Sequence, residues 1–97
     1  MIIFIDIDKT ICYTPDNGEY SQSTPIHKNI KKANDLYDKG NTIIYWTARG
    51  IVTGINWQQL TKKQLKDWGV KFNEIRFDKP YYDVFIDDKA MNVKDWK

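Results

Sequence analysis

Short apolar runs alternate with helix-like segments along this chain, and that alternation most constrains the fold. Residues 2–7 and 42–46 are rich in β-branched and aromatic side chains, as is typical of strands buried in a sheet. Residues 24–40 and 61–69 carry helix start and stop signals, and residues 84–86 form a third apolar run. The order strand, helix, strand, helix, strand predicts an α/β fold with a parallel sheet.

The chain has 97 residues and predicts one domain, residues 1–97, with no room for a separate substrate-binding domain. Fifteen basic residues against 13 acidic ones leave a net charge of +2, too balanced to indicate a nucleic-acid or membrane partner. Cys12 is the only cysteine, so no internal disulfide forms. The N-terminus has neither a basic stretch nor a long apolar run, and we expect a cytoplasmic protein.

Local signals refine these elements. Residues 9–24 lose strand character, and Asn17-Gly18 predicts a tight turn at the tip of a hairpin flap. Thr24-Pro25 predicts a helix start, and a capping-box pattern from Thr61 to Gln64 predicts a helix over about residues 62–68. The connection over residues 78–83 is shorter than a parallel crossover normally needs. Either it is a tight descending loop, or one of the two runs around Asn73, residues 70–72 and 74–77, is not a sheet strand.

Polar side chains stand where the predicted strands end. Parallel strands joined by right-handed crossovers place their carboxyl ends at one edge of the sheet, where ligands bind. Carboxylates gathered there repel one another unless a divalent cation neutralises them, and all-oxygen ligands suit Mg²⁺. A lysine and a hydroxyl beside them would serve a phosphoryl group. The residues concerned are Asp6 and Asp8 after the first strand, Thr47 after the second, Lys79 in the following loop, and Asp87 and Asp88 after the third.

These motifs, in this order, resemble those of the haloacid dehalogenase superfamily of phosphotransferases. The stretches 46–50, 60–69 and 79–90 are more narrowly similar to small capless phosphatases that are often associated with bacterial capsule or surface-sugar biosynthesis. The resemblance implies a small Rossmann-like, three-layer fold with a parallel sheet of about four strands and no cap domain. One departure is Lys9, which stands where many members have glycine; a side chain is tolerated there if the backbone keeps a negative φ.

The same resemblance implies a role for each residue. Asp6 would be the nucleophile that accepts the phosphoryl group, and Asp8 the general acid and base. Thr47 would hydrogen-bond the phosphoryl oxygens and Lys79 would neutralise them. Mg²⁺ would be bound by Asp6, Asp8, Asp87 and Asp88, and the substrate would be contacted by Thr10, Ala48 and Arg49. The fork of Arg49 suits a second phosphate or a carboxylate of the substrate, with a packing role as the alternative.

The expected function is therefore Mg²⁺-dependent hydrolysis of a phosphomonoester through an aspartyl-phosphate, on a small metabolite such as a sugar phosphate. One alternative is a polynucleotide or nucleotide end phosphatase, since such enzymes carry a similar Thr-Ala-Arg and an open site admits large substrates. Another is a relative that binds phosphate without turnover. A receiver-type signalling module is excluded by the order of its motifs, because here an acidic pair follows Lys79. By analogy with other capless proteins, we expect a homo-oligomer that covers the open site.

Overall fold

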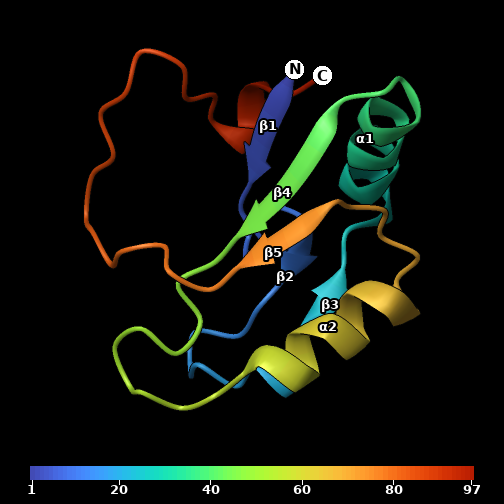
Figure 1. The fold of residues 1–97 in the computed structure, drawn as a ribbon. Helices are drawn as coiled ribbons and strands as arrows, with labels where there is room; N and C mark the ends of the chain where they lie inside the picture. The colour runs from blue at the N-terminus through green and yellow to red at the C-terminus, as the bar shows by residue number, and fades with distance from the viewer.

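The apolar runs near the N-terminus and in mid-chain form adjacent parallel strands. In the computed structural model, which describes residues 1–97, β1 (Ile2–Ile5) pairs with β4 (Thr42–Trp46), and β4 pairs with β5 (Glu74–Arg76) (Figure 1). The strand order in this sheet is β1-β4-β5, all parallel. The predicted α/β fold with a parallel sheet is confirmed.

Both α-helices pack on one face of this sheet. Helix α1 (His27–Asp38) connects β1 to β4, and α2 (Gln58–Asp67) connects β4 to β5. Both connections step across the sheet in the same direction, so right-handed crossovers place both helices on the same side. The predicted third layer is absent, because no further helical crossover follows β5. No helix is long and apolar enough to cross a membrane.

The core lies between the helices and the inward residues of the strands. Register places Ile3 beside Ile43, and Ile5 beside Tyr45, on one face. Because alternate residues of a strand face opposite sides, Ile2 and Phe4 lie on the other face, where they are 71% and 45% exposed. The buried apolar cluster comprises Ile5, Ile7, Ile11, Cys12, Ile30, Ala33, Ile43, Tyr45, Leu65 and Val70.

A hairpin flap follows β1, as predicted. Strand β2 (Cys12–Tyr13) pairs antiparallel with β3 (Thr24–Pro25), and a short 3₁₀ helix, η1 (Tyr20–Gln22), lies between them. At the tip, Gly18 has a φ of +75° and donates its N–H to the Pro15 carbonyl at 3.3 Å. The predicted helix start at Thr24-Pro25 is wrong, because those residues are used in β3 and α1 begins at His27.

Residues 84–86 do not form the predicted strand. They belong to a long segment that leaves the sheet after β5 as a wide loop, drawn in orange and red in Figure 1, before a second 3₁₀ helix, η2 (Val93–Asp95). Val84, Phe85 and Ile86 are 72%, 45% and 94% exposed. The sheet therefore has three strands instead of about four, and β1 has one edge without a partner strand.

Candidate active site

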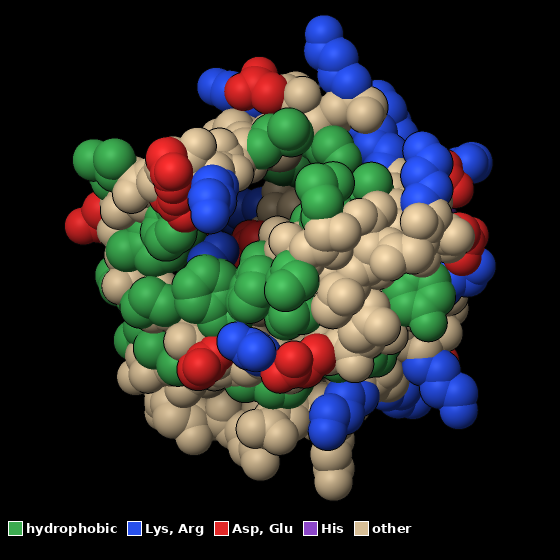
Figure 2. Space-filling model, turned by 45° about the horizontal axis from the view of Figure 1, so that its top comes forward, with side chains coloured by type: hydrophobic (Ala, Val, Ile, Leu, Met, Phe, Trp, Pro, Cys, Tyr) green, Lys and Arg blue, Asp and Glu red, His purple; other side chains and the backbone are tan.

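The carboxyl ends of β1 and β4 bring together the first group of predicted residues. Asp6 directly follows β1, Asp8 comes two residues later, and Thr47 directly follows β4. The space-filling view shows a hollow with basic and acidic side chains inside it and hydrophobic side chains around its rim (Figure 2). Asp6, Asp8 and Thr47 thus lie at the carboxyl edge of the sheet, where the sequence predicts them.

Asp6 is half-buried and held by two partners. Its Oδ1 lies 3.2 Å from Nζ of Lys79, and its Oδ2 accepts a hydrogen bond from the Thr10 hydroxyl at 3.3 Å. Burial raises the pKa of Asp6 above its ordinary value, and the nearby Lys79 offsets only part of that effect. The pair places a carboxylate oxygen next to a cation at the carboxyl end of β1, an arrangement that suits a nucleophile for phosphoryl transfer.

Lys79 reaches this point because its backbone is tied to the end of β4. Its N–H donates to the Thr47 carbonyl at 3.2 Å, although Lys79 belongs to the loop after β5. Burial lowers the pKa of Lys79, but Asp6 and the Tyr82 hydroxyl together outweigh it and raise the pKa above its ordinary value, so the ammonium stays charged. The Thr47 side chain is buried and its Oγ1 accepts the N–H of Arg49 at 3.1 Å. That contact leaves the Thr47 hydroxyl proton available to a phosphoryl oxygen.

Asp8 forms a salt bridge with Arg49. Nε of Arg49 donates to Oδ2 of Asp8 at 3.0 Å and Nη2 donates to Oδ1 at 2.8 Å, a bidentate pair. The Thr14 hydroxyl, from the flap, also donates to Oδ1. Asp8 keeps 23% of its side-chain surface exposed, whereas the Arg49 side chain is 0% exposed. The carboxylate is therefore fixed on one side and open on the other.

Two side chains of α2 that bind Arg49, those of Thr61 and Gln64, were not identified as site residues from the sequence. Nη1 of Arg49 donates to the Thr61 hydroxyl at 2.9 Å and to Oε1 of Gln64 at 2.7 Å. The sequence predicts a capping box from Thr61 to Gln64, but Thr61 lies inside α2 and both residues are buried. The available signal was a polar pair at i and i+3 on the core-facing side of a helix.

Cys12 adds no reactive group to this cluster. Its Sγ lies 3.6 Å from Oδ1 of Asp8, and the residue is buried. Burial raises the pKa of the thiol, with the charge of Asp8 adding to the effect. The thiol therefore stays protonated near neutral pH and acts as packing beside Asp8.

Asp87 and Asp88 are not brought to the edge. Both are exposed residues of the loop after β5, and Oδ1 of Asp87 accepts the N–H of Lys89 at 3.0 Å. No group of three or more His, Cys, Asp or Glu side chains lies close enough to hold a metal ion. Because residues 84–86 do not pair with β1 in this structure, Asp87 and Asp88 lie away from Asp6, and their shared metal site stays a prediction. Asp6 with the Arg49-bound carboxylate of Asp8 does not by itself form a Mg²⁺ site.

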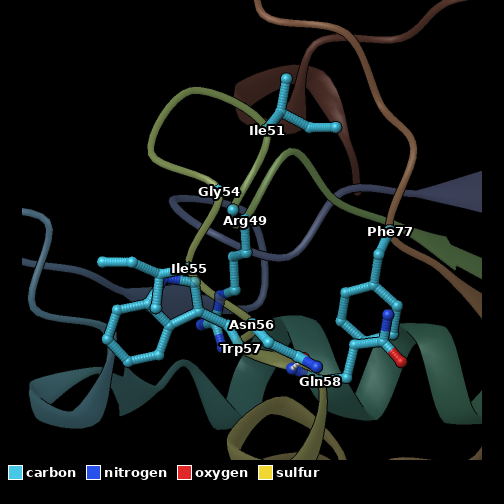
Figure 3. A pocket seen from close by; sticks show the side chains of 9 residues that line it. Arg49, Ile51, Gly54, Ile55, Asn56, Trp57, Gln58 and Phe77 are labelled. Atoms are coloured by element: carbon cyan, nitrogen blue, oxygen red, sulfur yellow. Dashed lines mark hydrogen bonds between the residues drawn. The ribbon is translucent and has the colours of Figure 1, made fainter.

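A second hollow opens beside Arg49, between the β4–α2 loop and the end of β5. It has a volume of about 220 Å³ and is lined by Arg49, Gly50, Ile51, Gly54, Ile55, Asn56, Trp57, Gln58 and Phe77. In Figure 3, Phe77 lies across from Trp57 and Ile55, with Arg49 between them. Gly50 has a φ of +87°, and a Cβ there would come within 2.4 Å of the Ile55 carbonyl oxygen. Only glycine therefore allows the loop to close around this hollow.

Four further residues singled out in the sequence meet different outcomes. Thr10 contacts Asp6, as described, and the carbonyl of Ala48 accepts the N–H of Ile51 at 3.0 Å, which places Ala48 in the turn after Thr47. Arg49 has no free donor directed to the hollow. Lys9 has a φ of +63°, so the negative φ under which a side chain would be tolerated there is not met. The hydrogen bond from its N–H to the Cys12 carbonyl, at 2.8 Å, fixes this turn despite a conformational cost of about 1–2 kcal/mol.

Comparisons with known proteins add information on the fold. No protein-family model matches the chain, and no curated protein matches it. The chain is similar in structure to an MCSG target from Vibrio cholerae, known from a crystal structure, with a TM-score of 0.84 and 24% sequence identity. The similarity covers 96% of this chain and 84% of that one. At this identity it establishes a shared fold.

Proposed function

We propose that this protein hydrolyses phosphomonoesters through an aspartyl-phosphate formed on Asp6. The observation that carries the proposal is the pairing of the half-buried Asp6 carboxylate with Lys79 at the carboxyl end of β1, 3.2 Å apart. Thr47 and Asp8 flank that pair from two strand ends. The resemblance of the motifs to capless phosphatases of the haloacid dehalogenase superfamily adds the substrate class, a small sugar phosphate.

The chemistry assigns each residue one task. An oxygen of Asp6 attacks phosphorus and the ester P–O bond breaks, while Asp8, in its protonated form, gives its proton to the leaving alkoxide. Lys79 and the Thr47 hydroxyl stabilise the charge on the phosphoryl oxygens. Asp8, now ionised, then takes a proton from water as the water attacks phosphorus. The P–O bond to Asp6 breaks, and inorganic phosphate and free Asp6 are released.

Mg²⁺ is part of the proposal and requires a change in the chain. Asp87 would need to approach Asp6, which residues 84–86 would achieve by pairing with the free edge of β1. Residues 77–83 can span roughly 20 Å, more than the three strand spacings, about 14 Å in all, that separate β5 from a new strand beside the free edge of β1. The apolar and exposed character of residues 84–86 supports this pairing. The metal would supply charge neutralisation on the phosphoryl group.

The test is phosphate release from sugar phosphates, nucleotides and 3′-phosphorylated oligonucleotides, with Mg²⁺ and with EDTA. We expect Mg²⁺-dependent release from a sugar phosphate and loss of at least about 1,000-fold in kcat for Asp6→Asn, because the nucleophile is gone. Asp35→Asn, an exposed carboxylate on α1, is the matched control and should keep full activity. Release from oligonucleotides alone would favour the end-phosphatase alternative. Full activity in Asp6→Asn would refute the mechanism.

A further inference from the structure

Arg49 is one of two arginines in the chain, and its guanidinium is fully used within the protein. Its Nε and Nη2 bind the Asp8 carboxylate, and its Nη1 binds Thr61 and Gln64. The remaining Nη2 proton points toward Cys12, whose Sγ is 4.0 Å away. A guanidinium has five N–H donors, so none is left over for a substrate phosphate. The predicted role of Arg49 as a substrate ligand therefore has no support in this geometry.

The flat face of the same guanidinium is covered by the flap. Its central carbon lies 4.7 Å from the centroid of the Tyr20 ring, a cation–π contact. Tyr20 is further fastened to α2, since its carbonyl accepts a hydrogen bond from Nε2 of Gln64 at 2.7 Å. Its ring also meets Trp57 edge to face, with centroids 5.2 Å apart. Gln64 thus contacts Arg49 through one end of its amide and the flap through the other.

A second contact links the flap to Asp8. The Thr14 hydroxyl donates to Asp8 and also lies 2.8 Å from Oγ of Ser23, which stands directly before β3. Two chains of contacts therefore link the flap to Asp8. One runs from Tyr20 through Arg49, and the other runs from Ser23 through Thr14. If the flap moves away, both routes lose contacts at once.

We propose that Arg49 is a positioning residue that couples closure of the flap to the orientation of Asp8. Arg49 holds the carboxylate by one side, leaves its other side open to substrate, and is itself held by Tyr20, Thr61 and Gln64. With the flap closed, Asp8 is fixed for proton transfer; with the flap displaced, Arg49 loses the Tyr20 ring and Asp8 loses the Thr14 hydroxyl, so the carboxylate is held less firmly. This inference rests on the proposed function only for its catalytic consequence, since the linkage itself is a property of the fold.

The kinetic test compares Arg49→Lys and Tyr20→Leu with Arg76→Lys, a change at the other arginine. Arg76 is exposed and paired with Glu74, so Arg76→Lys should match the wild-type enzyme. Lysine cannot make the bidentate grip, so Arg49→Lys should lower kcat by about 100-fold with KM within about threefold of wild type. Tyr20→Leu should lower kcat by about tenfold in the same manner. A rise in KM with kcat unchanged would show that Arg49 binds substrate and would overturn the proposal.

A second readout does not depend on activity. Hydrogen exchange should show faster exchange of the amides of residues 20–26 in Arg49→Lys and Tyr20→Leu, with exchange in β4 unchanged. Unchanged flap exchange in both variants would overturn the coupling, even if the enzyme is active. A wild-type protein that releases no phosphate, but whose flap exchange responds as expected, would refute the proposed function and support the coupling. Loss of β4 protection in Arg49→Lys would indicate a folding defect. The flap exchange measured in Tyr20→Leu would then decide whether the coupling exists.

Discussion

The hydroxyl of Tyr45 lowers the stability that the rest of this buried side chain provides. The residue is fully buried in β4, and its hydroxyl is the only buried side-chain oxygen or nitrogen without a hydrogen-bond partner. Its ring is well used, packing edge to face against Phe72 with centroids 6.3 Å apart. Burial also raises the pKa of the hydroxyl strongly. The ring stabilises the fold, while the unpaired hydroxyl costs part of that gain.

We predict that Tyr45→Phe stabilises the protein by about 1 kcal/mol at pH 7, because a buried unpaired hydroxyl is removed and the ring kept. The advantage should grow above about pH 10, where the unfolded tyrosine ionises and the buried one does not, so that wild-type stability falls. Urea unfolding at both pH values measures it, with Tyr81→Phe, at an exposed tyrosine, as control. A less stable Tyr45→Phe would show that the hydroxyl has a partner in solution.

For single residues, the sequence predicted which side chains gather at the edge of the sheet, but it did not predict which partners they bind there. Asp6, Thr47 and Lys79 meet as expected because strand ends share an edge, which follows from the alternation of elements alone. The burial of Arg49 could not be predicted, since its partners Thr61 and Gln64 come from a helix whose rotation the pattern did not settle. The positive φ of Lys9 depends on a turn closed by a main-chain hydrogen bond, which its side chain does not reveal.

At the scale of elements, residues 84–86 have the composition of a strand that could pair with β1, but they lie away from it. β1 has a free edge, and residues 84–86 carry a β-branched and aromatic run that is exposed. The sequence predicted this strand from its composition, but composition does not provide the crossover that would carry it to the sheet. The strands that helices connect formed and paired in a parallel sheet, and the run joined by a bare loop did not. Local pattern therefore identifies a strand candidate, whereas pairing depends on the connection.

We predict that Mg²⁺ with inorganic phosphate slows hydrogen exchange of the amides of residues 84–86 by about tenfold or more, because pairing with β1 protects them. Asp87→Asn should abolish the effect by removing the carboxylate that the metal would draw to Asp6. Asp95→Asn, in η2, is the matched control and should respond like wild type. Fast exchange of residues 84–86 under all conditions would refute the proposed ordering, and with it the part assigned to Asp87.

On the scale of the whole molecule, the sheet has one covered face and one without a helix. The residues of β1, β4 and β5 that face α1 and α2 are apolar, and the core includes residues from both helices. The opposite face carries Phe4 and Trp46, edge to face at 5.6 Å, with the Arg76 guanidinium over Phe4. Two layers therefore bear the stability of the chain, and the expected third layer would have covered Phe4 and Ile2.

This asymmetry makes a matched pair of substitutions on β1 informative. Ile5→Ala removes a side chain that is 6% exposed on the covered face and should cost about 2–4 kcal/mol in the free energy of unfolding. Ile2→Ala removes the same atoms from a position that is 71% exposed and should cost about 0.5 kcal/mol or less. Denaturant unfolding at several protein concentrations measures both. If Ile2→Ala costs as much as Ile5→Ala and the cost depends on concentration, a second copy of the chain covers that face in solution, and the two-layer monomer is not the complete folded unit.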